Sequence, residues 1–573
     1  MNYEWSYIPL SEEEQTRAVE MAAELKISPV LAQVLMRRGI SDAQAARKFF
    51  RPQLTDLHDP FLFQDMQKAV SRLNEALGRK ERILVYGDYD VDGCSAVALV
   101  YRFLQQFYSN IDYYIPDRNE DGYGVSRKGV DHACETGASL VIVLDCGIKA
   151  TDEVAYAKEK GIDFIICDHH VPGDELPPAV AILNAKRADN TYPYEHLCGC
   201  GVGFKLMQAF AISNGIEFSQ LIPLLDLCAI SIAADIVPIM GENRILAYHG
   251  LRQLNSSPSV GVKALMEVCG LKDKEISLGD IIFKIGPRIN ASGRMQTGNE
   301  AVALLIEKDP AAARMLAERI NKYNEQRKDL DKSMTEEANR IAATLEHQCE
   351  HKSIVLFNEE WHRGIIGIVA SRLTEVFYKP SVVLTEGDNG MATGSARSVP
   401  GFDVYKAIES CADLLTNFGG HTYAAGLSMP VEHVPAFRRR FEEYVEQHIQ
   451  PEQTSAILGI DAFVDFRDIT RRMAADIKRF APYGPDNHKP LFCTRQVYDY
   501  GTSKVVGRDQ EHIKLELVDS KSNNVMNGIA FGQSSQARYI KTKRAFDIVY
   551  NIEENTHKRG DIQLQIEDIK PRE

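Results

Sequence analysis

Residues 82–94 read RILVYGDYDVDGC, an apolar run that stops on the carboxylates of Asp88, Asp90 and Asp92. Short runs rich in Val and Ile, bounded by glycine or charge, are typical of buried β-strands. Because parallel strands bring their carboxyl ends to one edge of an open sheet, ligand sites form along that edge. The fold class predicted is therefore α/β, with a doubly wound parallel sheet. Two later runs end in the same way, SLVIVLDCGI on Asp145 and DFIICDHH on Asp168, His169 and His170.

These side chains suit a hard divalent cation. Carboxylate oxygens with a few imidazoles favour Mg²⁺ or Mn²⁺ over the thiolate sites that hold zinc. A calcium-binding EF-hand is excluded, because Leu99 stands where that loop needs a glutamate. Asp235, in SIAADIVPI, either adds a further carboxylate or simply caps a helix. Two neighbouring ions need a bridging carboxylate and terminal ligands, so the pattern indicates a metal-dependent hydrolase of phosphate esters.

The composition sets limits without choosing a reaction. A chain of 573 residues, 44% hydrophobic and 25% charged, is ordinary globular material with length for roughly three or four domains. The formal net charge of −14 argues at face value against a nucleic-acid partner, since Lys and Arg usually dominate affinity for phosphates. Part of that charge is acid gathered at the proposed metal site, so the average is a poor guide to the partner.

Targeting and redox features indicate the cytoplasm. The N-terminus has no basic region followed by an apolar run, and the most apolar stretch, residues 221–240, is interrupted by Asp226 and Asp235. The 11 cysteines include no C-x-x-C pair, and Cys146 and Cys167 belong to apolar strand segments, where reduced thiols pack as small hydrophobes. We expect neither secretion nor a membrane span.

The chain divides into five segments by pattern. Ser11 with Glu14, and Ser41 with Gln44, have the spacing of capping boxes that open helices. Strand and helix patterns then alternate, a stretch dense in helix formers follows, and short alternating strands occupy the end of the chain. The predicted segments are a helical N-terminal segment at 1–50, an α/β domain at 51–308, a long connecting helix at 309–350, a smaller α/β domain at 351–450 and a β-barrel at 451–573.

Four motifs, GDYDVDG, LDCGI, CDHH and AADIVP, occur in the order in which the DHH phosphoesterases carry their metal ligands. CGCGVGFKL, GPRINASGRM, GSARS and GGHTYAAG match further segments of that family, so the resemblance covers nearly the whole chain. Within the family, the sequence looks like the exonucleases specific for single-stranded DNA. The resemblance implies a DHH catalytic domain at 51–308, a DHHA1-type substrate-binding domain at 351–450 and an OB-fold nucleic-acid-binding domain at 451–573.

The family pattern, carried over by position, implies a site for two ions, either Mn²⁺ or Mg²⁺. Asp90 and Asp92 would bind separate ions and Asp145 would bridge them, while His169 and Asp235 would complete the second ion's site. The implied metal ligands are thus Asp90, Asp92, Asp145, His169 and Asp235.

The resemblance also implies catalytic roles for His170, Asp145 and Asp88. His170 would face the substrate phosphate as a charge stabiliser or proton donor. Asp88 would not bind an ion itself but would lie next to the residues that do.

Substrate contacts are expected mainly in the second α/β domain. Ser395 and Arg397 look placed to hold a 5′-terminal phosphate, since the planar guanidinium binds phosphate through two hydrogen bonds. The glycines beside His421 would let the backbone approach the ligand closely. For each residue alone, a surface ion pair or a turn is the competing interpretation. Further candidates for phosphate or DNA contact are Arg118, Asn290 and Arg294.

The reaction implied is 5′ to 3′ degradation of single-stranded DNA to mononucleotides, in DNA recombination and repair. The barrel would hold the strand by stacking bases on aromatics, although we expect most of Tyr483, Phe492, Tyr498 and Tyr500 to be barrel core. We expect a monomer that binds single-stranded DNA and no membrane, with a single-strand-binding protein and a helicase as possible partners.

Three alternatives stay open. A DHH phosphodiesterase acting on short oligonucleotides or cyclic dinucleotides would use the same metal site, usually without such a barrel. A related pyrophosphatase would have a shorter chain. A non-catalytic DNA-binding replication scaffold would have lost the metal carboxylates that are present here.

Overall fold

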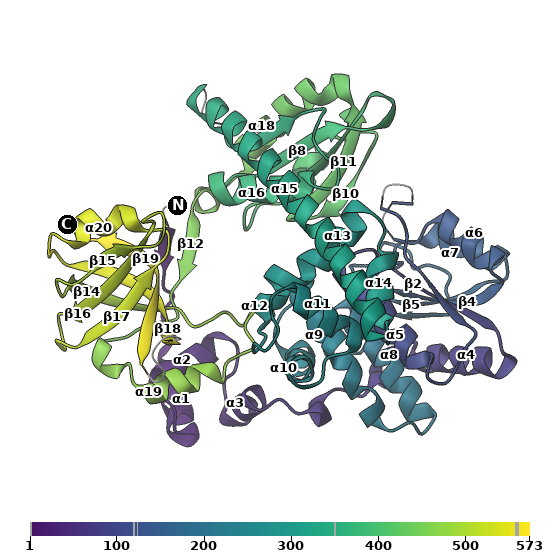
Figure 1. Ribbon diagram of the computed structural model, residues 1–573, viewed down its shortest axis with the longest axis horizontal. Helices are drawn as coiled ribbons and strands as arrows, with labels where there is room; N and C mark the ends of the chain where they lie inside the picture. Colours follow the sequence, from purple (N-terminus) through teal and green to yellow (C-terminus); the bar gives the residue numbers. More distant parts are fainter. Residues whose placement is uncertain (1–2, 119–120, 123, 349–350, 556–560, 573) are drawn as a thin grey trace. The chain divides into compact units, whose positions relative to one another are not determined.

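The computed structural model contains two compact units, which are described separately (Figure 1). Unit 1 comprises residues 1–5, 294–296 and 319–458, and unit 2 comprises residues 6–293, 297–318 and 459–573. The structure describes residues 3–118, 121–122, 124–348, 351–555 and 561–572.

Unit 2 contains the parallel sheet that the sequence predicts. Its five strands lie in the order β3-β2-β4-β5-β6, and every neighbouring pair is parallel. The apolar runs ending on acidic or imidazole side chains form β2, β4 and β5, which are buried almost throughout. The strands are β2 (Arg82–Gly87), β3 (Ile111–Tyr114), β4 (Ala138–Leu144), β5 (Asp163–Cys167) and β6 (Ala181–Leu183).

Helices cover both faces of this sheet, which confirms the doubly wound class (Figure 1). One face packs on α6 and α7 through side chains such as Leu84, Val141 and Phe164. The other face packs on α4, α5 and α8. These helices are α4 (Met66–Arg79), α5 (Val91–Leu104), α6 (Arg127–Glu135), α7 (Thr151–Glu159) and α8 (Gly199–Ser213).

A group of helices follows the sheet in the chain and supplies the remaining wall of the site. Among them α9 is almost entirely buried, and it packs against α5, α8 and α10. The segment between α12 and α13 is a π-helix, labelled η5. The bounds are α9 (Leu225–Ala234), α10 (Gly241–Ser256), α11 (Val260–Val268), α12 (Leu278–Asp280), η5 (Ile281–Ile285), α13 (Gly286–Met295) and α14 (Asn299–Ile306).

The N-terminal helices α1 (Glu12–Leu25), α2 (Pro29–Arg37) and α3 (Ala43–Phe50) share a hydrophobic core with the barrel. The capping box of Ser11 and Glu14 is confirmed. The one predicted for Ser41 and Gln44 is wrong, because Asp42 caps α3 and its carboxylate accepts a 2.8 Å hydrogen bond from the Ala45 N–H. Asp is as good an N-cap as Ser, and it stands one residue closer to the helix.

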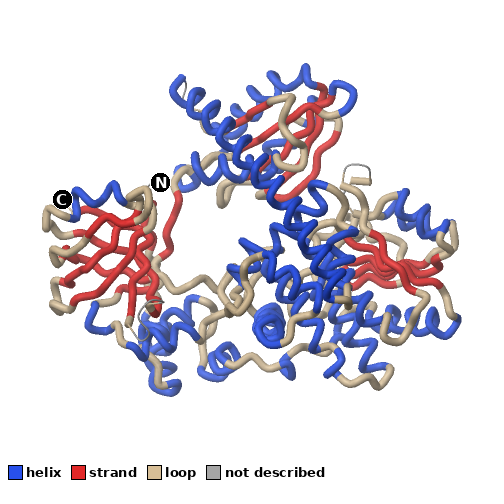
Figure 2. Tube along the Cα trace, in the orientation of Figure 1, coloured by secondary structure: helices blue, strands red, loops and turns tan. Residues whose placement is uncertain are grey.

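Residues 492–571 close into the predicted barrel, whose strands are red at the left of Figure 2. The order β14-β18-β19-β17-β16 is closed by a second pairing of β14 with β16. Phe492 is fully buried in the barrel, as expected, whereas Tyr500 is 59% exposed. The strands are β14 (Phe492–Asp499), β16 (His512–Asp519), β17 (Val525–Ala530), β18 (Phe546–Glu554) and β19 (Ile562–Pro571).

Unit 1 contains a mixed sheet in the order β10-β11-β9-β8-β7, in which only β7 and β8 are parallel. The long helix predicted over 309–350 is α15 (Pro310–Gln348), and residues 349–350 lie outside the described residues. No helix in the described part of the chain is both long and apolar enough to cross a membrane. The other elements are β7 (Ile354–Phe357), α16 (Ile366–Phe377), β8 (Ser381–Glu386), β9 (Met391–Arg397), α17 (Val404–Glu409), β10 (Asn417–His421), β11 (Ala424–Pro430) and α18 (Val434–His448).

Candidate metal centre

The first acidic cluster turns the chain sharply from β2 into α5. Asp90 is the N-cap of α5, and its carboxylate accepts a 3.0 Å hydrogen bond from the Gly93 N–H. A Cβ on Gly93 would lie 2.4 Å from the carbonyl oxygen of Asp88, so only glycine fits this turn. The turn places Asp92 in the first turn of α5, where it is buried.

The carboxylate of Asp92 is held by three donors from two helices. The N–H groups of Gly199 and Cys200, at the start of α8, each donate to it at 2.7 Å. The hydroxyl of Ser231, on α9, donates to it at 2.6 Å. Gly199 has no room for a side chain, because its Cβ would lie 2.5 Å from the Cβ of Asp145. The start of α8 and the Ser231 hydroxyl therefore hold the Asp92 side chain in place.

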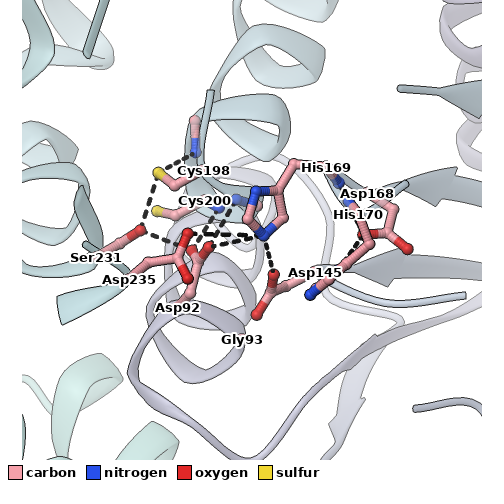
Figure 3. Close-up of polar contacts among 12 residues, drawn as sticks. Asp92, Gly93, Asp145, Asp168, His169, His170, Cys198, Cys200, Ser231 and Asp235 are labelled. Atoms are coloured by element: carbon pink, nitrogen blue, oxygen red, sulfur yellow. Dashed lines mark hydrogen bonds and ion pairs between the residues drawn. The ribbon is translucent and has the colours of Figure 1, made fainter. Parts of the chain in front are cut away.

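His169 is the centre of the site. Its Nε2 atom lies 3.1 Å from Asp145 Oδ1, 3.6 Å from Asp235 Oδ2 and 3.9 Å from Asp92 Oδ2 (Figure 3). The ligand atoms of Asp92, His169 and Asp235 all lie within 4.8 Å of one another, and so do those of Asp145, His169 and His170. One imidazole is thus shared by two adjacent groups of metal-ligand atoms.

Asp168 holds His169 and His170 in place through hydrogen bonds. Its carboxylate accepts hydrogen bonds from the N–H groups of Ile148, His169 and His170, and it lies 2.8 Å from His170 Nδ1. Burial alone would raise the pKa of Asp168, but the hydrogen bond and charge of His170 lower it to about 2. Burial likewise works against protonation of His170, yet the hydrogen bond to Asp168 raises the pKa of His170. This pairing fixes the ring and favours its protonated form.

The remaining acids crowd into a buried space. Burial, and then the charges of Asp92 and Asp90, raise the pKa of Asp145 and of Asp235 above the ordinary carboxyl value. Burial and the charge of Asp90 do the same for the pKa of Asp88. Burial lowers the pKa of the His169 imidazole to about 4, so its ring is neutral at ordinary pH. Like charges at such separations need positive charge between them.

The donor set fits a divalent metal ion. Asp88 Oδ1, Asp145 Oδ1, His169 Nε2 and Asp235 Oδ2 are buried atoms without a hydrogen-bond partner among the described residues. Buried polar atoms are rarely left without a partner, and a cation would satisfy three of these at once. Carboxylates with a neutral imidazole are ligands for Mn²⁺ and Mg²⁺.

Two residues at the site have strained backbones. Asp145 has φ +61° and Ile236, directly after Asp235, has φ +57°. The left-handed region is unfavourable for a β-branched residue and costs on the order of 1–3 kcal/mol. The surrounding structure must therefore hold the chain on both sides of the Asp235 carboxylate.

Two of the predicted substrate residues lie near this centre in unit 2. The guanidinium of Arg118 lies 5.3 Å from the ring centre of Tyr89, and its charge favours the ionised form of Asp88. Asn290 lies on α13 between Gly286, which packs against Ala234 and Val91, and Gly293, which packs against Tyr89. Residues 286, 290 and 293 share one helix face, so Asn290 faces the turn that carries Asp88 and Asp90.

The other predicted contacts gather in unit 1 around the start of α16. Gly367, in the first turn, approaches both side chains of interest, because a Cβ there would lie 3.0 Å from Ser395 Oγ and 3.2 Å from Arg397 Nη2. The Arg397 Nη1 group donates to Ser395 Oγ at 3.0 Å. Arg294 belongs to unit 1 and donates to the Gly364 carbonyl at 2.9 Å.

His421 lies in the same sheet as Ser395 and Arg397. His421 pairs with Ala424, and Ala424 pairs with Arg397, so the three lie in one row across β10, β11 and β9. The next row on the same face of the sheet, two residues along each strand, contains Ser395, Gly426 and Gly419. A Cβ on Gly419 would meet no atom within 4 Å. The glycines leave open space beside Ser395 and Arg397.

Several residues that shape the site were missed by sequence reasoning. The run CGCGVG opens α8, and the N–H groups of Gly199 and Cys200 at its start bind Asp92, a contact that the motif did not indicate. Ser231 lies within a continuous apolar segment, so nothing in the sequence marks it. Gly364 and Gly367 follow Trp361 in WHRGIIG, a glycine spacing that could have drawn attention.

Family models match most of the chain and agree with this architecture. The DHH family N-terminal domain matches residues 82–232, the DHHA1 domain matches residues 350–447, and the RecJ OB domain matches residues 460–568. The fold and the site thus define a DHH-family phosphoesterase, a metal-dependent hydrolase.

Comparison with individual relatives shows which family within this class the chain belongs to. The chain is 34% identical over 557 residues to the single-stranded-DNA-specific exonuclease RecJ of Bacillus subtilis, covering 97% of this chain and 70% of that protein. It is 32% identical to the RecJ exonuclease of Escherichia coli, covering 98% of each chain. The chain belongs to the RecJ family of single-stranded-DNA-specific exonucleases.

A solved structure of the family supports the metal assignment. The crystal structure of Thermus thermophilus RecJ in complex with Mn²⁺ has 27% sequence identity and a TM-score of 0.85, and the match covers all of this chain and 80% of that one. A structure of the same protein contains Mg²⁺. Both ions are of the type that the donor set of unit 2 suits.

Proposed function

We propose that this protein hydrolyses single-stranded DNA from its 5′ end to mononucleotides, with divalent cations held by the carboxylates and imidazoles at the edge of the parallel sheet. The proposal rests on one observation. His169 Nε2 lies within 3.9 Å of carboxylate oxygens of Asp92, Asp145 and Asp235. These side chains are crowded into a buried space, where several of their atoms have no hydrogen-bond partner among the described residues. Asp92, Asp145, His169 and Asp235 would hold Mn²⁺ or Mg²⁺. We propose Asp90 as a fifth ligand.

Side chains around the cations would assist the reaction. When bound, the cations supply positive charge that lowers the pKa of a bound water and offsets negative charge on the phosphate. His170 would donate from Nε2 to a phosphate oxygen, because its Nδ1 atom is engaged by Asp168. Asp88, buried beside Asp90, would hold the surrounding turn and its charge balance. The hydrogen bond to Asp168 raises the pKa of His170 and would favour the protonated ring that this role needs.

The 5′ phosphate would be bound in unit 1. Ser395 and Arg397 lie against the first turn of α16, where N–H groups and the helix dipole favour an anion. Arg397 offers a planar fork for a terminal phosphate, and Arg294 and His421 border the same surface. Recognition of that phosphate would set the direction of degradation.

The small-substrate alternatives are less well supported. The RecJ OB domain match over residues 460–568 corresponds to a closed barrel, which a dinucleotide or pyrophosphate substrate would not need. Roles in recombination and repair, a cytoplasmic location, a monomeric state and partners such as a single-strand-binding protein or a helicase stay predictions.

The experiment compares 5′-labelled and 3′-labelled single-stranded DNA in Mn²⁺ or Mg²⁺, with duplex DNA and a cyclic dinucleotide as further substrates. We expect labelled mononucleotide to appear at once from the 5′-labelled strand and late from the 3′-labelled strand. The variant Asp145→Ala should abolish both signals while still binding DNA.

A matched control is Asp174→Ala, which removes an exposed carboxylate from the loop that follows the two histidines. It should leave the rate unchanged. Cleavage of the cyclic dinucleotide alone would overturn the substrate, and binding without cleavage in the wild type would favour a scaffold.

A further inference from the structure

Asp235 differs from the other carboxylates in how it is held. The side chain of Asp92 accepts three hydrogen bonds from α8 and α9, whereas Asp235 Oδ2 has no hydrogen-bond partner among the described residues. The backbone on both sides of Asp235 therefore has a larger part in placing its carboxylate than it has for Asp92. The Asp235 N–H continues the ladder of α9 by donating to the Ser231 carbonyl at 2.9 Å, and the chain then turns through the left-handed Ile236.

The chain beyond Ile236 is anchored on the segment that leads into the barrel strand β14. The Ile239 N–H donates to the carbonyl of Pro485 at 2.9 Å. The side chain of Ile239 is buried, and a Cβ on Gly484 would lie 2.5 Å from its Cγ1 atom. Residues 484–485 belong to the RecJ OB domain match, not to the DHH domain match. Asp235 thus lies four residues before Ile239, which is in close contact with the barrel domain.

The anchoring segment is itself firmly held. Asn487 is buried, and its side-chain amide donates to the carbonyls of Phe480 and Pro482 at 2.8 and 2.7 Å. Gly484 and Asn487 exchange two backbone hydrogen bonds of 3.1 Å. The guanidinium of Arg244, from α10, donates to the carbonyls of Phe480 and Ala481 at 2.9 Å. These bonds give the segment one conformation against which Ile239 packs.

We infer that Gly484 and Pro485 are positioning residues for Asp235, so that the barrel domain completes the metal centre in addition to any contact it makes with DNA. This inference rests on the proposed role of Asp235 as a metal ligand. Removing the close approach would let the strained turn at Ile236 relax and would move the carboxylate away from His169. Outer contacts of metal ligands commonly contribute about 10- to 100-fold to metal affinity.

The test is Gly484→Ala in the full chain. The added methyl group would lie 2.5 Å from Ile239 Cγ1 and must displace the Ile239 side chain, since this atom is at the first branch of the side chain and not at its flexible end. We expect the affinity for Mn²⁺, measured by calorimetry on metal-free protein, to fall about 10-fold. Activity at limiting Mn²⁺ should fall and should recover at high Mn²⁺, with the KM for a long strand unchanged.

The matched control is Gly459→Ala, which adds the same methyl group near the barrel but meets no atom within 4 Å. It should bind Mn²⁺ like the wild type. The double variant Gly484→Ala with Ile239→Ala makes room for the methyl group and should recover part of the affinity. If Gly484→Ala fails to fold, Ile239→Val, which removes only the outermost methyl group, should weaken Mn²⁺ binding about 2- to 3-fold by the same route.

Wild-type Mn²⁺ affinity in a folded Gly484→Ala or Ile239→Val variant would overturn the inference, whatever the change in melting temperature. Asp235→Asn separates this failure from failure of the site itself. If Asp235→Asn loses Mn²⁺ while Gly484→Ala keeps it, only the positioning role falls. If Asp235→Asn also keeps wild-type affinity, Asp235 is not a ligand and both proposals about it fall.

Discussion

The parallel sheet of unit 2 and the mixed sheet of unit 1 both have five strands, yet they present functional side chains differently. In unit 2 the side chains follow the strand ends, where turns and helix starts bury them. In unit 1, Ser395 and Arg397 lie within β9, two residues apart on one face of the strand. The first arrangement suits a crowded, charged reaction site, and the second suits an open surface that binds a ligand group.

The burial of the two regions differs accordingly. Asp92, Asp145 and His169 are buried, whereas Ser395 and Arg397 are half-buried and His421 is exposed. A deeply buried charge depends strongly on its partners, and a half-exposed charge is partly supported by water. We therefore expect substitutions in unit 2 to act mainly on the chemical step and on metal binding, and substitutions in unit 1 to act mainly on substrate affinity.

The largest effect should come from Asp92→Asn. Loss of this proposed metal ligand would remove several kcal/mol of charge stabilisation, so kcat should fall by roughly 10³-fold or more. Binding of single-stranded DNA to unit 1 and the barrel should persist. Single-turnover degradation and fluorescence anisotropy measure the two quantities, and a parallel fall in DNA affinity would contradict the separation of roles.

The next effect should come from Arg397→Ala. A hydrogen bond to a charged group contributes about 1.5–3 kcal/mol, so the KM for a 5′-phosphorylated strand should rise roughly 10- to 100-fold. A strand with a 5′-hydroxyl should show little change. The control is Arg372→Ala, an exposed residue of α16 paired with Glu375. An equal effect on both strands would show that Arg397 does not read the phosphate.

A smaller effect should appear in the pH profile of Asp168→Asn. The hydrogen bond to Asp168 raises the pKa of His170, so the protonated ring persists to higher pH in the wild type than in the variant. If His170 acts as a proton donor, activity is retained below that pKa and lost as the pH rises through it. The alkaline limb of kcat should move to lower pH in the variant. An unchanged limb would remove His170 from this role.

The smallest effect should be the local stabilisation by Mn²⁺. Mn²⁺ at about 10 times its Kd adds roughly 1.4 kcal/mol to the stability of the folded state that binds it. Hydrogen exchange should slow at the ends of β2, β4 and β5 in unit 2 and stay unchanged in β9 to β11 of unit 1. Equal slowing in both units would contradict the assignment of the metal to unit 2 alone.

The central strands of the parallel sheet could be predicted from the sequence, because they are short, apolar and bounded by turn residues. The runs before Asp88, Asp145 and Asp168 form β2, β4 and β5 as predicted. The cap of α3 was placed one residue too early, at Ser41, since Ser and Asp cap equally well and only the backbone geometry distinguishes them.

The support around the carboxylates could not be predicted in the same way. Ser231 and the N–H groups of Gly199 and Cys200 bind Asp92 from positions more than 100 residues away. Sequence spacing has no information on such contacts, because they depend on how α8 and α9 pack against α5. The same holds for Gly367, which approaches Ser395 and Arg397 across a helix and a strand.

The sequence by itself determined which side chains stand beyond the ends of the parallel strands, since a local apolar pattern sets each strand and the residues that follow it supply the carboxylates and imidazoles. Only the tertiary structure decided how those side chains are held. Asp92 is fixed by the start of α8. Asp235 lies four residues before Ile239, which is anchored on Gly484 and Pro485. The physical reason is that hydrogen bonds and close packing between distant segments exist only after the segments have come together.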